Sequence, residues 1–101
     1  MGTRLELQNK FEELLGSRNV YYKPPENLKM KYPAIRYNLS DIESRFADNV
    51  KYSNLNCYDV IVIDTEPDNE VIRKILELPY TSFERSYIAD NLYHDIIKIY
   101  Y

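Results

Sequence analysis

The stretch Cys57-Tyr58-Asp59-Val60-Ile61-Val62-Ile63 decides the fold. It is almost entirely apolar and rich in β-branched residues, which favour strands. Because both faces of such a strand have to be covered, it is expected at the centre of a sheet. We place this strand from Val50 or Lys51 to Asp64.

The segment before the central strand alternates in polarity from Pro33 to Leu39, which indicates a half-buried strand. One face carries Ile35, Tyr37 and Leu39, and the other carries Ala34, Arg36 and Asn38. The polar run from Ser40 to Asn49 is interpreted as a long hairpin connection, with a short strand or helical turn near Ser44 as an alternative.

A helix is predicted near the N-terminus, from Thr3 to Leu15. Thr3 and Glu6 have the spacing of a capping box, and Gly16 is a candidate C-terminal cap. The helix has one apolar stripe, made of Leu7, Phe11, Leu14 and Leu15. A short strand within 19–23 is expected next, ended by the prolines that open an exposed loop from Pro24 to Lys31.

After the central strand, Thr65-Glu66-Pro67-Asp68 is expected to open a second helix, with Pro67 in its first turn and Pro79 at its end. The apolar stripe of this helix consists of Val71, Ile72, Ile75, Leu76 and Leu78.

Two strands close the chain, from Ser82 to Ala89 and from Tyr93 to Tyr101. The dipeptide Asp90-Asn91 predicts the turn between them. Phe83 and Tyr87, with Arg85 as a further candidate, are expected on one face of the first of these strands.

These elements predict an α+β fold, a mainly antiparallel sheet with two helices packed on one face in the order α-β-β-β-α-β-β. The 101 residues fit a single domain, 1–101. No apolar run approaches the length of a membrane span, and the first residues lack the apolar region of a signal peptide. The chain is therefore expected to work in a cytosol or in something assembled there.

The residues of common catalytic and cofactor sites are scarce. Cys57 is the only cysteine, which excludes an internal disulfide, and His94 is the only histidine. Gly2 and Gly16 are the only glycines, so a phosphate-binding loop is excluded. The cluster Asp64, Glu66, Asp68 and Glu70 lacks the pattern of a calcium loop and is interpreted as negative charge at a helix N-terminus. We expect no enzyme activity, no catalytic or metal site and no cofactor.

Tyrosine is unusually frequent, with eleven residues against three phenylalanines and no tryptophan. Tyr suits surfaces that become buried on assembly, although it also replaces Phe in strands. A basic cluster of Lys23, Lys29, Lys31 and Arg36 interleaved with tyrosines leaves a small nucleic-acid-binding module as one alternative. The net charge of −3 argues against general binding to phosphates.

Several short motifs together resemble a known family. They are Tyr-Pro-Ala-Ile-Arg-Tyr (32–37), Ala-Asp-Asn with a following Tyr (47–52), Tyr-Asp-Val-Ile-Val-Ile-Asp (58–64), Phe-Glu-Arg-Ser-Tyr (83–87) and Asp-Asn-Leu-Tyr-His-Asp (90–95). From about residue 5 to 101 the pattern is similar to the tail-terminator, or tail-completion, proteins of long-tailed bacteriophages and prophages, which are also labelled minor capsid or head–tail joining proteins.

The resemblance implies a virion protein that forms a ring, commonly a hexamer, at the head-proximal end of the tail. Such a ring ends polymerisation of the tail tube and meets the head connector or stopper, and DNA passes its lumen without specific binding. Assembly would take place in the host bacterial cytoplasm, without a membrane. A head-completion or connector-stopper protein is the alternative joining role. The residues expected at contacts with other subunits or in contact loops are Lys23, Lys29, Lys31, Arg45, Asp48, Asn49, Tyr52, Arg85, Asp90 and His94.

Overall fold

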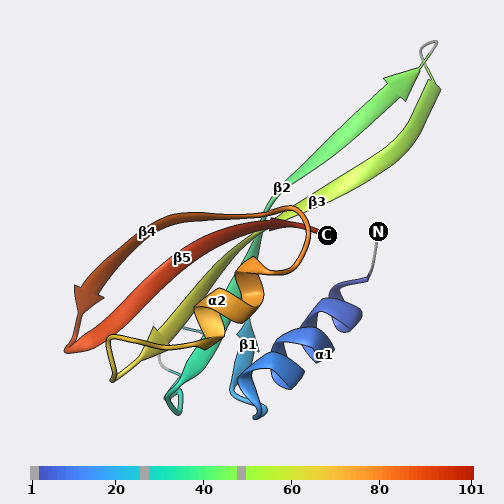
Figure 1. Cartoon of the computed structure of the whole chain (residues 1–101). Helices are drawn as coiled ribbons and strands as arrows, with labels where there is room; N and C mark the ends of the chain where they lie inside the picture. The colour runs from blue at the N-terminus through green and yellow to red at the C-terminus, as the bar shows by residue number, and fades with distance from the viewer. Residues whose placement is uncertain (1–2, 26–27, 48–49) are drawn as a thin grey trace.

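The described residues of the computed structural model form two helices and five strands, which follow one another in the predicted order (Figure 1). The elements are α1 (Arg4–Leu15), β1 (Val20–Tyr22), β2 (Ala34–Ala47), β3 (Val50–Asp64), α2 (Val71–Leu76), β4 (Thr81–Ala89) and β5 (Leu92–Tyr100). The structure describes residues 3–25, 28–47 and 50–101, with the backbone alone described for 41–47 and 50–55. Among the described helices, none is long and apolar enough to span a bilayer.

The strands form one mixed sheet in the order β1-β2-β3-β5-β4. The apolar strand β3 lies at its centre, as its sequence predicts. Neighbouring strands are antiparallel except β1 and β2, which pair in parallel. The segment from Lys23 to Pro33 is the crossover that this parallel pair requires.

Both helices cover the same face of the sheet (Figure 1). Leu7 and Phe11 of α1 and Val71 and Ile75 of α2 pack there against buried residues of the strands. On the sheet side this core contains Val20, Ile35, Tyr37, Tyr58, Val60, Val62, Ile97 and Ile99. The predicted α+β architecture, with helices on one face, is confirmed.

The two helices differ in how well the sequence predicts them. In α1 the Thr3 hydroxyl accepts a hydrogen bond from the Glu6 amide at 3.2 Å, and Gly16 ends the helix with φ of 78°. The predicted start of α2 at 65–68 is wrong, because the Asp64 carboxylate accepts hydrogen bonds from the Thr65 amide (2.6 Å) and the Asn69 side chain (2.7 Å). These bonds fold 64–69 into a loop, so Pro67 precedes the helix.

Strands β2 and β3 extend well past the rest of the sheet as a two-stranded hairpin (Figure 1). The prediction of a connection over 40–49 is wrong, because β2 continues to Ala47 and pairs with β3 along its whole length. The hairpin makes the protein 51 Å long but only 27 and 23 Å across, with a radius of gyration of 14.6 Å. A compact domain of this length has a radius of gyration of about 13 Å.

The terminal hairpin has the predicted two-residue turn. Asp90 and Asn91 have φ of 52° and 61°, as a type I′ turn requires. A bulge at Glu84, however, changes the alternation of β4. Phe83 lies opposite buried Ile97, whereas Tyr87 lies opposite His94, which faces the other side of the sheet. The expectation that Phe83 and Tyr87 share a face is therefore wrong, although Arg85 and Tyr87 do share one.

Candidate subunit interface

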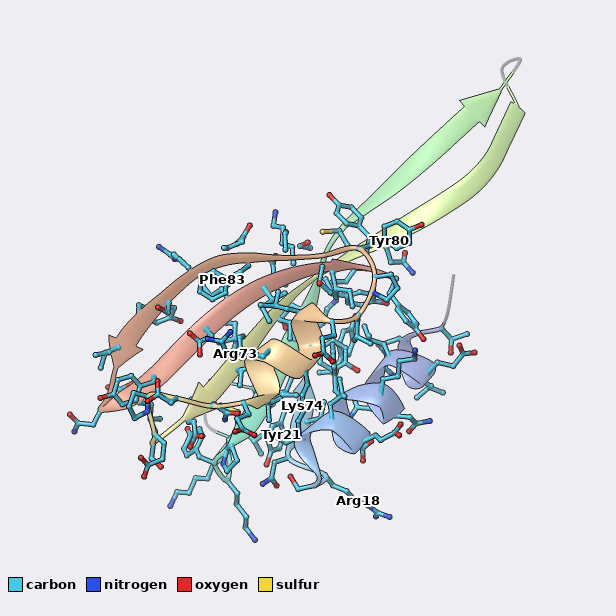
Figure 2. The ribbon with its side chains drawn as sticks, viewed as in Figure 1. Arg18, Tyr21, Arg73, Lys74, Tyr80 and Phe83 are labelled. Atoms are coloured by element: carbon cyan, nitrogen blue, oxygen red, sulfur yellow. The ribbon has the colours of Figure 1, made fainter. Side chains whose placement is uncertain are left out.

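The strand β4 lies at one edge of the sheet and carries a row of exposed apolar side chains. Ile88 is 66% exposed and Phe83 is 49% exposed, and Tyr80, just before the strand, is 79% exposed. Figure 2 labels Tyr80 and Phe83 at this edge. Edge strands of monomeric proteins are commonly protected by charges, bulges or short length. Only the bulge at Glu84 and the charges of Glu84 and Arg85 protect β4, which leaves its second half regular and apolar.

Tyr87 and His94 make the most ordered contact on the face opposite the helices. Their rings stack with centroids 4.6 Å apart and an interplanar angle of 9°. The guanidinium of Arg85 lies 5.6 Å from the centroid of the Tyr87 ring. His94 Nδ1 is 3.0 Å from the carbonyl oxygen of Leu92, a bond that orients the ring. The arrangement places the Tyr87 ring parallel to the His94 ring of β5.

Charged side chains cross the same face in a row of alternating sign. Lys98 and Asp59 lie opposite each other in the register of β5 and β3, and Lys98 Nζ is 3.6 Å from a Glu84 carboxylate oxygen. The neighbouring Glu84 carboxylate, followed by Asp59, raises the pKa of Lys98. Arg36 Nε and one Asp59 carboxylate oxygen are buried without a hydrogen-bond partner. Opposite charges thus largely balance across this face, which gives it no strong preference for an anionic partner.

A groove of about 610 Å³ lies between α2 and β5 on the helix side. Asp95 lies in it together with Pro67, Ile72, Arg73 and Glu77. Burial raises the pKa of the Asp95 carboxyl, and the neighbouring His94 lowers it by a smaller amount. The remaining lining residues are the polar and charged side chains Asp68, Asn69, Glu70 and Lys74. Its described residues include no cluster of three or more side chains that could hold a metal ion.

The predicted contact residues fall into three separate regions. Lys23, Lys29 and Lys31 are exposed in the crossover segment between β1 and β2, where the Lys31 amide donates to the Tyr21 hydroxyl at 3.4 Å. Arg45 and Tyr52 belong to the projecting part of β2 and β3, where a register shift follows Arg45. Asp48 and Asn49 lie outside the described residues.

The third region is the terminal hairpin, which carries Arg85 and His94 on its two strands and Asp90 in its turn. Exposed apolar side chains accompany this group at Tyr87 and Ile88, and they accompany Lys29 and Lys31 at Leu28 and Tyr32. Tyr80 and Ile88 were not among the contact residues predicted from the sequence. The sequence could have indicated that Ile88 is exposed, because it lies in the predicted strand next to a turn and beyond the last core position.

The structure separates the only thiol from the only imidazole. Cys57 pairs with Tyr100, whereas His94 pairs with Ile63, six positions further along β3. At the rise of a strand this separation is about 20 Å, which excludes a Cys–His catalytic pair. Cys57 is buried, as the sequence predicts. In the part of the chain that the structure describes, no cluster of three or more potential metal ligands is found.

The comparisons with known proteins add no family assignment. No protein-family model matches the chain, and no curated protein matches it.

Proposed function

We propose that this chain is a structural subunit that assembles with copies of itself, in the role of a phage tail terminator. The observation that carries this proposal is the hairpin of β2 and β3, which extends beyond the sheet without a neighbouring strand among the described residues. An isolated two-stranded hairpin is marginally stable in water. A projection of this length is therefore expected to be held by contacts with another subunit.

The exposed side chains of β4 support the same proposal. Tyr80, Phe83 and Ile88 present apolar surface at an edge that no described element covers. A chain with one projecting element and one receptive edge joins its neighbours head to tail, and such an interface closes into a ring when the rotation permits. A ring is the form that the family resemblance implies. The tail-tube protein and the head connector would then meet the two faces of the ring.

The alternative of a nucleic-acid-binding module has less support. It needs tyrosines on the surface beside Lys23, Lys29 and Lys31. Tyr37 is instead buried in the core, and Tyr22 packs against it with ring centroids 4.9 Å apart. The basic loop thus lacks two of the four tyrosines of the stacking platform that its sequence suggested.

Native mass spectrometry and negative-stain electron microscopy of the purified chain test this proposal. We expect a closed oligomer whose population rises with protein concentration. A chain that stays monomeric at concentrations up to about 100 μM would overturn it, since subunit contacts of standard size have far lower dissociation constants. A titration with fluorescent single-stranded DNA at low salt is the control for the alternative, and we expect no saturable binding.

A further inference from the structure

The edge of β4 turns defined backbone groups toward solvent. The two-residue turn Asp90-Asn91 makes Ala89 and Leu92 a hydrogen-bonded pair, and alternate residues then bond toward β5. The backbone of Tyr87 is therefore hydrogen-bonded to that of His94, whereas Ser86 and Ile88 direct their backbone N–H and C=O groups away from the sheet. The same alternation along β5 holds at the start of β4, where the Tyr100 amide donates to the Tyr80 carbonyl at 3.1 Å.

This edge is the better acceptor of the two that the sheet offers. The opposite edge strand, β1, has only three residues. β4 has nine, and from Arg85 to Ala89 its register with β5 is continuous. Exposed Ile88 lies within this regular part. An added strand would gain both backbone hydrogen bonds and apolar contacts here.

The projecting hairpin supplies strands that lack a partner on their outer sides. Within the described chain, β1 stops pairing with β2 at Tyr37, and β5 stops pairing with β3 at Cys57. The outer side of 40–47 in β2 and of 50–55 in β3 therefore faces no described strand. Eight residues of β2 span about 26 Å, close to the roughly 30 Å of the nine residues of β4. The outer side of β2 is thus long enough to cover the regular segment 85–89 of β4, which spans about 16 Å.

We propose that β4 of one copy pairs with an outer strand of the β2–β3 hairpin of a neighbouring copy, either antiparallel or parallel to β4. The sheet then continues from subunit to subunit. This inference rests on the proposed function as a self-assembling subunit and names the surfaces that join. The hairpin and β4 belong to different parts of the same chain, so each copy both donates and accepts. Such a contact is heterologous, and when a ring closes it pairs every β4 edge with one outer strand of a neighbouring hairpin.

Proline at an outward-facing position tests this pairing with little change to the subunit itself. Ser86→Pro removes an N–H that bonds to no strand within the subunit, and proline is tolerated at such edge positions. We expect the variant to keep the wild-type circular dichroism spectrum. Its association constant should fall at least about tenfold, because the pyrrolidine ring of proline blocks the approach of an added strand. Ser86→Ala is the matched control and should assemble as the wild type does.

The outcomes separate this inference from the proposed function. A wild-type oligomer together with a monomeric Ser86→Pro variant supports both. Equal assembly of the two proteins overturns the strand pairing and leaves the proposed function intact, whereas a monomeric wild type overturns both. A complex that forms only when another protein is added overturns pairing between copies.

Disulfide trapping decides the question if Ser86→Pro fails to fold. In a Cys57→Ser background, one tagged copy carries Ile88→Cys, and the other carries a cysteine at one of the positions 41–46 or 50–55 in turn. Paired strands bring Cα atoms to about 4.5–5.5 Å, within disulfide range. We expect crosslinks at alternate positions of one strand of the hairpin. Absence of crosslinks at every position would overturn the pairing.

Discussion

The hydroxyl of Tyr37 donates a hydrogen bond to the side-chain oxygen of Gln8, which joins the middle of the sheet to helix α1. The Gln8 amide in turn donates to the Val20 carbonyl at 3.0 Å, and Arg4 donates to the Tyr37 hydroxyl at 3.3 Å. The ring of Tyr37 is fully buried and packs edge-on against Phe11 with centroids 5.3 Å apart. Tyrosine is used here as a core residue with a satisfied hydroxyl.

Replacing this hydroxyl provides the first prediction. Tyr37→Phe keeps the ring but leaves Gln8 and Arg4 without their shared partner, so we expect the free energy of unfolding to fall by about 1 kcal/mol. Urea denaturation followed by circular dichroism measures the change. Tyr80→Phe, at a largely exposed position, is the control and should leave the midpoint unchanged. An unchanged midpoint for Tyr37→Phe would mean that the bond contributes no net stability.

Asp95 leads to a prediction about pH. Burial raises the pKa of its carboxyl in the folded state, only partly opposed by His94, so the folded protein holds this proton more tightly than the unfolded chain does. This group therefore destabilises the fold at neutral pH, and the penalty disappears as the pH falls below the usual pKa of aspartate, about 3.9. We expect Asp95→Asn to be more stable than the wild type at pH 7.

The comparison at two pH values distinguishes this effect from a change in packing. Urea denaturation of both proteins should give a stability difference at pH 7 that shrinks toward pH 3. Asp68→Asn, at an exposed position, is the matched control and should change the free energy of unfolding at pH 7 by less than about 0.5 kcal/mol. A difference for Asp95→Asn that is the same at both pH values would contradict the titration argument.

The terminal turn yields a third prediction. Asn91 has φ of 61°, a region that residues other than glycine, asparagine and aspartate occupy at a cost of roughly 1–2 kcal/mol. We expect Asn91→Val to lower the free energy of unfolding by about that amount, while Asn91→Gly keeps it or raises it. Thermal unfolding of the pair measures the difference. Equal melting temperatures for the two variants would show that the turn carries no such constraint.

The sequence predicted best those elements whose apolar pattern meets the core. The central strand β3 and helix α1, with its caps Thr3 and Gly16, lie where the pattern placed them. Within the projecting hairpin, 50–56 was predicted as part of the central strand, whereas 40–47 was predicted as a connection because this polar run lacks the alternation of a half-buried strand. The strands of the hairpin are specified by pairing with each other, which a single segment does not reveal.

The candidate interface was predicted only in part for a related reason. Arg85 and His94 were selected from the sequence, and the structure places them together at the terminal hairpin. The bulge at Glu84 shifts the faces of β4 by one residue, and strict alternation therefore misassigned Phe83. Tyr80 has φ of 61° and stands in the connection before β4, where no periodic pattern applies.

Cys57 gives the last prediction. Its side chain is only 3% exposed, in the central strand next to the base of the projecting hairpin. A buried thiol reacts with a disulfide reagent such as DTNB only when the chain opens, so we expect labelling in native buffer to proceed at the opening rate and to become immediate in denaturant. Cys57→Ala should assemble like the wild type, because the thiol packs as a small apolar group. Rapid labelling of the folded protein, or loss of assembly in a folded Cys57→Ala variant, would show that the thiol has a role at the subunit surface.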